Sequence, residues 1–400
     1  MQVRALGFLV AIGTVSGFVA VSPAQDAEPA GATGPKMELI QTIRNGEGGV
    51  TKMAAIAGLQ IQGDYLYVGG KKSITWFKRD VKTGQLAYAG TVAVNDRIGN
   101  TPCLLALAGG RLYAAGKALA WYEIDPKTGQ LVEKGVTECN GATAVITGPD
   151  QKDLYVFTQP PAHHAGTVNI AWYRIDADGK PVQSREVTGE GILFNHFSSL
   201  VAAPDGKTVY SLSDFIKGAV VCLARAPNGE IAHRQCIDLE QVSKIPRMAY
   251  HRQWCELDLT PDGKWLYASI SKTFYEGGTN APCQTYLFKR DAATGDLAFQ
   301  EVIKDRVRHL QFLPDSTGGF LARPSGSFES FALDHANGHL TTTGRLPELD
   351  GQAAMNLALD AENGLLYAAT FQWDGYEPPA SMIKSNAGDC LFVIRTGKGK

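Results

Sequence analysis

The sequence lacks the motifs that identify many common enzyme classes. It contains no Walker phosphate loop, no Gly-x-Ser-x-Gly nucleophile elbow, no His-Glu-x-x-His zinc motif and no EF-hand loop. Lys/Arg-rich runs are also absent and the formal net charge is −2, so the electrostatic footprint of a nucleic-acid binder is missing. We therefore expect small molecules or proteins as partners, and predict neither a metal site nor a cofactor.

The cysteines show no Cys-x-x-Cys spacing, which excludes the usual metal knuckle and redox motif. Cys222 and Cys236 flank the Pro227-Asn228-Gly229 turn, so a disulfide across a hairpin is conceivable. Neighbouring strands do not by themselves give the Cα separation that a disulfide needs. The total of seven is odd, and we expect buried thiols for most of them.

A single long apolar run stands at the N-terminus. Arg4 precedes apolar residues 5–21, and Ser22-Pro23-Ala24 places small residues at the positions of a signal-peptide cleavage site. We predict a signal peptide over residues 1–24, a flexible linker over 25–36, and export to the periplasm or the extracellular space. The alternative is an uncleaved anchor, because about twenty apolar residues span a bilayer. Twin arginines are absent from this segment. A second apolar stretch is also absent, so no membrane span is expected after cleavage.

The rest of the chain is a repeat of about fifty residues. Each copy has an apolar-Tyr start, a strand of small residues, an alternating aromatic strand and a glycine turn. Examples are LYVGGKKSITWFKRDVKTGQL from residue 66 and LYAAGKALAWYEIDPKTGQL from residue 112. Seven copies begin at residues 66, 112, 154, 209, 266, 320 and 366.

The repeat predicts four antiparallel strands per copy. Period-two alternation of aromatic and β-branched residues indicates strands, and the Asp-x-x-Thr-Gly turns at Gly84, Gly129 and Gly295 permit the positive φ of a reversal. Such a unit cannot bury both faces alone, so neighbouring units must stack. We therefore predict an all-β, seven-bladed β-propeller over residues 37–400.

The two ends of this region complement each other. The last copy ends after its third strand, at residues 391–395, whereas residues 37–43 form a strand that has no blade of its own. We predict that residues 37–43 complete the last blade and close the ring. The alternative is an unpaired edge strand, which would be a template for aggregation.

The pattern Pro-Asp-Gly-Lys-x-Leu-Tyr, followed by aromatic-x-x-Asp-x-x-Thr-Gly-x-Leu, resembles the lactonase family of seven-bladed propellers. That family includes the propeller-type 6-phosphogluconolactonases and the fungal carboxymuconate lactonizing enzymes. The resemblance covers the chain after residue 37. It implies hydrolysis of a lactone or, as a further possibility, lactonizing activity on a muconate-like acid.

The resemblance also nominates site residues. The Pro-His-x-His segment of the family is matched at His196, with Ser198 in place of the second histidine, and Asp214 lies in the next loop. The Gly-Pro-Arg-His segment resembles Ile245-Pro246-Arg247-Met248, with His251 displaced by an insertion. A third segment resembles Val307-Arg308-His309-Leu310.

Lactone hydrolysis needs a base for water and a partner for the oxyanion. We expect His196 or Glu256 as the base, and Arg247 and Arg308 as anion clamps. His251, His309 and Asp214 are expected to bind substrate, because the loops that lead into the inner strands open on one rim. Each has a structural alternative: a loop histidine for His196, a solvated His251, blade-to-blade contacts for Arg308 and His309, an outward-pointing Glu256, and a turn-forming Asp214.

Two long insertions, residues 274–282 and 372–379, interrupt otherwise short blades. Trp373 and Tyr376 could form an aromatic lip that stacks on a sugar or peptide, or could pack within their own loop. His163 and His164 are adjacent and point to opposite sides of an extended chain, which favours a loop over a metal pair.

Two functions remain open. The first is an exported, lactonase-like hydrolase that acts on a lactone or sugar-derived substrate at the mouth of the central channel. Since the phosphorylated sugar lactone of the family is cytosolic, an exported enzyme would meet a different lactone. The alternative is a non-catalytic propeller that binds a protein or glycan through its rim loops. We expect a monomer in either case.

Overall fold

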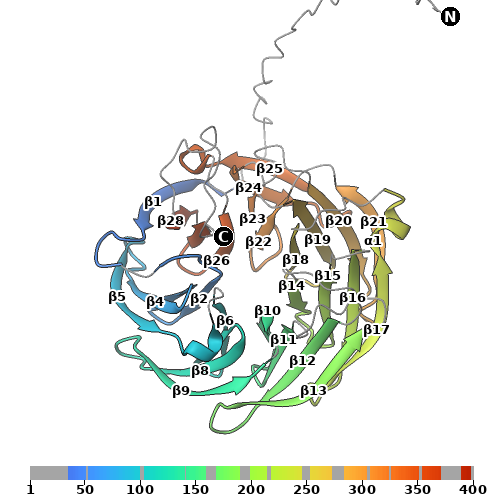
Figure 1. The fold of residues 1–400 in the computed structure, drawn as a ribbon. Coiled ribbons are helices and arrows are strands. Elements are labelled where there is room, and N and C mark those ends of the chain that lie inside the picture. Colours follow the sequence, from blue (N-terminus) through green and yellow to red (C-terminus); the bar gives the residue numbers. More distant parts are fainter. Residues whose placement is uncertain are drawn as a thin grey trace, which may run out of the picture. The chain divides into compact units, whose positions relative to one another are not determined.

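A computed structural model describes the protein over residues 35–50, 53–99, 103–139, 141–158, 168–189, 199–213, 218–245, 253–272, 283–303, 307–323, 326–350, 354–370 and 389–397. These residues all belong to one unit of the chain, Ala32–Lys400. They form seven four-stranded antiparallel sheets arranged as the blades of a ring (Figure 1). The predicted all-β, seven-bladed propeller is therefore confirmed.

Each of the first six blades uses four consecutive strands, from the inner strand outward. Blades 1 and 2 consist of β2 (Gly58–Gln62), β3 (Tyr65–Gly70), β4 (Ser73–Arg79) and β5 (Leu86–Ala93), then β6 (Leu104–Ala108), β7 (Arg111–Ala115), β8 (Ala118–Ile124) and β9 (Leu131–Glu138). Blades 3 and 4 consist of β10 (Ala142–Thr147), β11 (Asp153–Thr158), β12 (Val168–Ile175) and β13 (Pro181–Gly189), then β14 (Ser199–Ala202), β15 (Thr208–Ser213), β16 (Ala219–Arg225) and β17 (Ile231–Asp238).

The remaining blades complete the ring. Blades 5 and 6 consist of β18 (Gln253–Leu259), β19 (Trp265–Lys272), β20 (Cys283–Arg290) and β21 (Leu297–Ile303), then β22 (His309–Phe312), β23 (Gly318–Ala322), β24 (Phe328–Leu333) and β25 (Leu340–Arg345). Blade 7 consists of β26 (Ala354–Asp360), β27 (Leu365–Thr370), β28 (Cys390–Thr396) and β1 (Met37–Arg44).

Short helical turns connect some blades: α1 (Leu239–Ser243), η1 (Asp96–Ile98) and η3 (Pro347–Leu349). Asp238 caps α1, because its carboxylate accepts a hydrogen bond from the Gln241 N–H. None of the helices in the described part of the chain has the length and hydrophobicity to cross a membrane.

The inner strands β2, β6, β10, β14, β18, β22 and β26 contact one another in that order, and β26 contacts β2. They surround the centre of the ring in Figure 1. In three blades the start of the inner strand pairs with the end of the second strand, as Ser199 does with Leu212, Gln253 with Lys272, and Ala354 with Thr370. In each of these blades the start of the inner strand and the end of the second strand therefore lie at the same end of the sheet.

An apolar cluster fills each boundary between neighbouring blades. At the boundary of blades 5 and 6, Tyr267 and Leu287 pack against Leu310 and Phe312, and all four are buried. Alternation of side chains along each strand supplies an apolar face to both neighbours. Burial of these faces is the main stabilisation available to the ring.

The predicted Thr-Gly turns end the third strand of several blades. In blade 2 the Asp125 carboxylate accepts hydrogen bonds from the Lys127 and Thr128 N–H groups, and Gly129 has a φ of +68°. A Cβ at Gly129 would lie 2.4 Å from the Tyr65 ring of blade 1. Glycine is therefore required twice over, by the backbone conformation and by the approach of the neighbouring blade.

A tyrosine on the second strand of one blade reaches the hairpin glycine of the next blade. The hydroxyls of these buried tyrosines donate hydrogen bonds to glycine carbonyls at distances of 2.6 to 3.0 Å. The pairs are Tyr67–Gly129, Tyr113–Gly179, Tyr155–Gly229, Tyr210–Gly295 and Tyr267–Gly338. We call this contact the tyrosine latch. It joins each blade from 1 to 5 to its successor.

At two of these boundaries an arginine of the next blade strengthens the latch. Arg290 Nε donates to the Tyr210 hydroxyl at 2.7 Å, and Arg290 Nη2 pairs with Asp205 at 2.6 Å. Arg225 makes the equivalent bonds to Tyr155, Asp150 and Asp153. Charge-assisted bonds of this kind are stronger than neutral ones when they are buried.

The N-terminal strand closes the ring as predicted. β1 pairs antiparallel with β28, from Met37 opposite Thr396 to Arg44 opposite Cys390. The Gln41 side chain also bonds both the N–H and the C=O of Leu86 in blade 1. The strand therefore links blade 7 to blade 1 as well as completing blade 7.

The conceivable disulfide between Cys222 and Cys236 is not formed. The two cysteines lie on paired strands, but Cys236 stands opposite Val221 and Cys222 opposite Gln235. Both are free thiols, with Cys222 buried and Cys236 exposed. The register of the hairpin thus separates them by one position.

Deletion of residues 37–43 should strongly lower thermal stability, because it removes the strand that pairs with β28 and the buried Ile43. We expect a fall in Tm on the order of 10 °C in a thermal melt. The matched control deletes residues 25–34, most of the predicted linker over residues 25–36, and should leave the Tm unchanged. An unchanged Tm after deletion of residues 37–43 would refute closure by this strand.

Tyr210→Phe should cost about 2 kcal/mol of unfolding free energy, because it removes a hydroxyl that serves both Gly295 and Arg290. Tyr113→Phe removes the bond to Gly179, and the position equivalent to Arg290 in blade 3 is Ile175, so about 1 kcal/mol is expected. Urea unfolding of both variants measures the difference. Equal costs would argue against the arginine contribution.

Candidate functional site

Two acidic residues of the inner strand of blade 5 point toward blade 6. Along β18, Cys255 and Leu257 are buried in the apolar cluster shared with blade 4. Since side chains alternate along a strand, Glu256 and Asp258 lie on the opposite face. This settles the orientation of Glu256, which the sequence left open: it faces the neighbouring blade.

His309 is the first residue of β22, the inner strand of blade 6. It occupies the position equivalent to Glu256, because His309 stands five residues before Pro314 and Glu256 stands five residues before Pro261. Neighbouring blades repeat the same geometry, so equivalent positions on successive inner strands lie side by side. The blade repeat therefore brings two side chains together that are 53 residues apart in the numbering of the chain.

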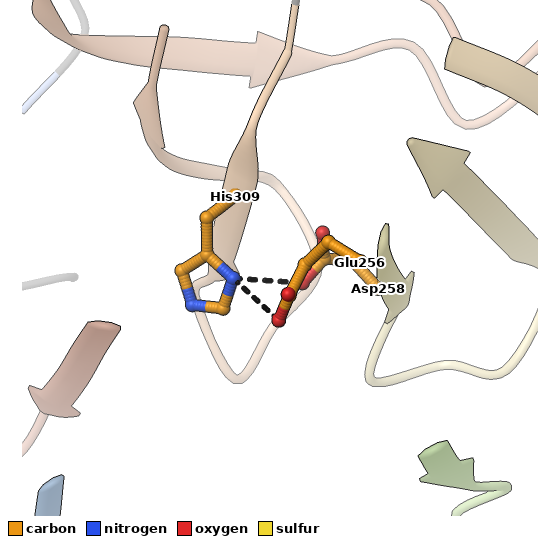
Figure 2. A group of neighbouring side chains, drawn as sticks. All are labelled: Glu256, Asp258 and His309. Atoms are coloured by element: carbon orange, nitrogen blue, oxygen red, sulfur yellow. Dashed lines mark ion pairs between the residues drawn. The ribbon is translucent and has the colours of Figure 1, made fainter. Parts of the chain in front are cut away.

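The three side chains meet between the blades, as Figure 2 shows. His309 Nδ1 lies 3.0 Å from Glu256 Oε1 and 3.8 Å from Asp258 Oδ1. The exposed fraction of the side chain is 15% for His309, 18% for Glu256 and 8% for Asp258. We call these three residues the blade 5–6 cluster. It is largely buried but retains some access to solvent.

The electrostatics of the cluster follow from burial and mutual charge. Burial raises the pKa of the Asp258 carboxyl to about 7; Glu256 adds to this rise, while His309 and the Leu310 N–H oppose it. For His309, burial lowers the pKa, but the negative charges of Glu256 and Asp258 outweigh burial and raise the pKa to about 9. Three ionisable groups thus share a small volume of low polarity.

Two details fix the orientation of the donor atoms. Asp258 Oδ2 accepts a hydrogen bond from the Leu310 N–H at 3.1 Å, which leaves Oδ1 facing His309. His309 Nδ1 is buried and lies 3.0 Å from Glu256 Oε1, a contact that helps to raise the pKa of His309. The imidazole is therefore held by its contact with the Glu256 carboxylate.

Arg308 supplies positive charge beside the cluster. Its side chain is buried, its backbone N–H donates to the Ala322 carbonyl, and its charge lowers the pKa of His309. Arg323, which follows Ala322, pairs with the buried Glu329, and this carboxylate also accepts hydrogen bonds from Ser327 and Thr342. This network fixes the part of blade 6 that borders His309.

The structure places three of the nominated site residues. Glu256 and His309 are brought together, and Arg308 is within electrostatic range of His309. The other six nominated residues lie outside the described residues: His196, Asp214, Arg247, His251, Trp373 and Tyr376.

Asp258 was not nominated by the sequence. The signal that could have found it is the period-two alternation of β18, which puts Asp258 on the same face as Glu256. Its contact with Leu310 in the next blade required knowledge of how the inner strands are stacked.

No protein-family model matches the sequence, and no curated protein matches it either. Solved structures do match the fold. A periplasmic gluconolactonase from Pseudomonas aeruginosa has a TM-score of 0.55 and 20% identity, over 72% of this chain and 85% of that chain. A candidate 6-phosphogluconolactonase from Bacteroides fragilis has a TM-score of 0.56 and 20% identity, over 71% and 82%.

The chain shares the fold of the lactonase propellers. The same fold is shared with hydrazine synthase from Kuenenia stuttgartiensis, with a TM-score of 0.58 and 15% identity over 89% of this chain and 99% of that chain. A function for this lactonase-like propeller therefore has to be argued from its own side chains.

Proposed function

We propose that this protein hydrolyses a lactone of a sugar-derived acid, with the blade 5–6 cluster as its reactive centre. The observation that carries the proposal is the convergence of Glu256, Asp258 and His309 on the inner strands of neighbouring blades. At the boundary of blades 4 and 5, the Ser199 hydroxyl joins the inner strands instead. Burial of two carboxylates and an imidazole costs folding free energy, and ionisable groups perturbed in this way cluster at functional sites.

Lactone hydrolysis has modest chemical requirements. Water adds to the acyl carbon while it loses a proton, the ring C–O bond breaks, and the ring oxygen takes up a proton to give a hydroxy acid. Carboxylate and imidazole groups are those that bind water and accept or return its protons. The 15–18% exposure of the His309 and Glu256 side chains leaves the cluster accessible to water.

Arg308 suits the developing negative charge. A guanidinium next to the reacting carbonyl stabilises an oxyanion and the carboxylate of the product. Its influence on His309 puts its charge within range of the cluster. In this proposal Arg308 is the anion-binding group, and the cluster binds water and accepts or returns its protons.

The substrate class rests on two supports. The fold neighbours include a gluconolactonase described as periplasmic and a candidate 6-phosphogluconolactonase. The N-terminal sequence predicts export, and an exported enzyme meets unphosphorylated sugar lactones rather than cytosolic sugar phosphates. We therefore propose an exported enzyme for a neutral sugar δ-lactone.

The test is turnover of a lactone panel in a pH-stat, with glucono-δ-lactone as the first substrate and spontaneous hydrolysis subtracted. Wild-type protein should accelerate hydrolysis, and Glu256→Gln and His309→Gln should each lower kcat by about 10²-fold or more.

The matched control is Glu301→Gln. Glu301 and His339 form another carboxylate–imidazole pair between blades 5 and 6, but both are about half exposed, on the outer side of the blades. This variant should retain wild-type activity. Absence of turnover on every lactone by folded protein would reject the hydrolase and favour the binding propeller; wild-type activity in Glu256→Gln would reject this centre.

A further inference from the structure

We propose that the blade 5–6 cluster binds one divalent transition metal ion of the Zn²⁺ or Mn²⁺ type, through Glu256, Asp258 and His309. The donor set itself carries this inference, and only the catalytic use of the ion rests on the proposed function. Sequence spacing could not indicate the site, because its donors come from two strands in different blades.

The donor atoms are close enough to share an ion. One donor atom from each of the three residues lies within 4.8 Å of the other two. Metal–ligand bonds of about 2.1 Å place neighbouring donors about 3.0 to 3.4 Å apart. The observed separations from His309 Nδ1 are 3.0 Å to Glu256 and 3.8 Å to Asp258, so small side-chain adjustments suffice.

The bonding of the individual atoms favours a ligand role. Asp258 Oδ2 is occupied by the Leu310 N–H, and Oδ1 is the oxygen that faces His309. Such backbone bonds typically orient a carboxylate ligand from behind. His309 Nδ1 faces both Glu256 Oε1 and Asp258 Oδ1, so an ion placed between the three atoms would replace its contact with Glu256.

The charge of the deprotonated donor set suits a cation. Coordination needs His309 as a neutral imidazole, so a bound ion would displace the proton that Glu256 and Asp258 otherwise favour there. The two carboxylates would then carry a charge of −2, of which Arg308 offsets about one unit. A dication would supply the remaining compensation in a place where water is largely excluded. The mixture of one nitrogen and two oxygen donors suits Zn²⁺ or Mn²⁺ better than Ca²⁺ or Mg²⁺, which prefer oxygen alone.

A simpler role as a contact between inner strands does not explain the cluster. At the boundary of blades 4 and 5, Ser199 occupies the position equivalent to Glu256 and His309, five residues before Pro204. Its hydroxyl accepts a hydrogen bond from the Leu257 N–H at 3.0 Å. One serine hydroxyl is therefore enough to join two inner strands. Three ionisable side chains are more than this structural contact requires.

Three protein ligands leave coordination positions open, as in catalytic zinc sites. The Glu256 and His309 side chains are partly exposed, so water can reach these open positions. A bound ion could there hold a water molecule and lower its pKa, which would provide the nucleophile for the hydrolysis proposed above.

The test is isothermal titration calorimetry of tag-free, chelator-treated full-length mature protein with ZnCl₂ and with MnCl₂. Wild-type protein should bind one ion per chain. Asp258→Asn and His309→Gln should each weaken binding at least about 10-fold, and the triple variant with Glu256→Gln should abolish it. The amide oxygen that Asp258→Asn introduces can still accept the Leu310 N–H, and circular dichroism with a thermal melt checks that each variant folds.

The control is the Glu301→Gln/His339→Gln variant, which should bind like wild type. Absence of binding to wild-type protein, or equal binding by the triple variant, would overturn the metal site. Metal binding without turnover of any lactone would remove the proposed function and leave the metal site standing. Lactone turnover that survives chelation, in protein that binds neither ion, would remove the metal site and leave the hydrolase.

Discussion

The hydroxyl of Tyr267 in blade 5 donates a hydrogen bond to the Gly338 carbonyl of blade 6 at 2.6 Å. The Tyr267 ring also packs on Phe312 of β22, with ring centroids 5.6 Å apart. Tyr267 stands directly opposite Asp258 in the β18–β19 pair. The contact that fixes the spacing of the two blades thus lies beside the cluster that bridges them. Fold and candidate site depend on the same tyrosine latch.

In the part of the chain that the structure describes, the boundary of blades 6 and 7 lacks the tyrosine latch. At the position equivalent to Tyr267, blade 6 has Phe320, opposite Gln311 of β22. Blade 7 has no Thr-Gly hairpin to receive a hydroxyl, because β28 ends at Thr396 and the fourth strand comes from β1. The hydroxyl of a tyrosine at this position of blade 6 would therefore find no hairpin glycine carbonyl in blade 7 to accept its hydrogen bond. Apolar packing and the pairing of β1 with β28 replace it.

The sequence predicted what depends on local pattern. Alternation, glycine turns and repeat length were sufficient for the blades, and the missing fourth strand identified residues 37–43 as its replacement. Arg308 and His309 were nominated because they match a segment of the lactonase propellers, and Glu256 because a carboxylate inside its strand could face the channel. Asp258 and the contact between Glu256 and His309 depend on how blades stack, which no local pattern records. The same is true of the one-position offset that keeps Cys222 and Cys236 apart.

The arrangement of the cluster follows from these constraints. Equivalent positions on neighbouring inner strands are brought side by side by the ring, and at this boundary they carry Glu256 and His309, with Asp258 on the same face. Diffraction from crystals grown with MnCl₂, recorded for anomalous scattering, tests the account most directly. It predicts one peak about 2.0 to 2.2 Å from a carboxylate oxygen of Glu256, Asp258 Oδ1 and His309 Nδ1. A map with no peak between these side chains would contradict it.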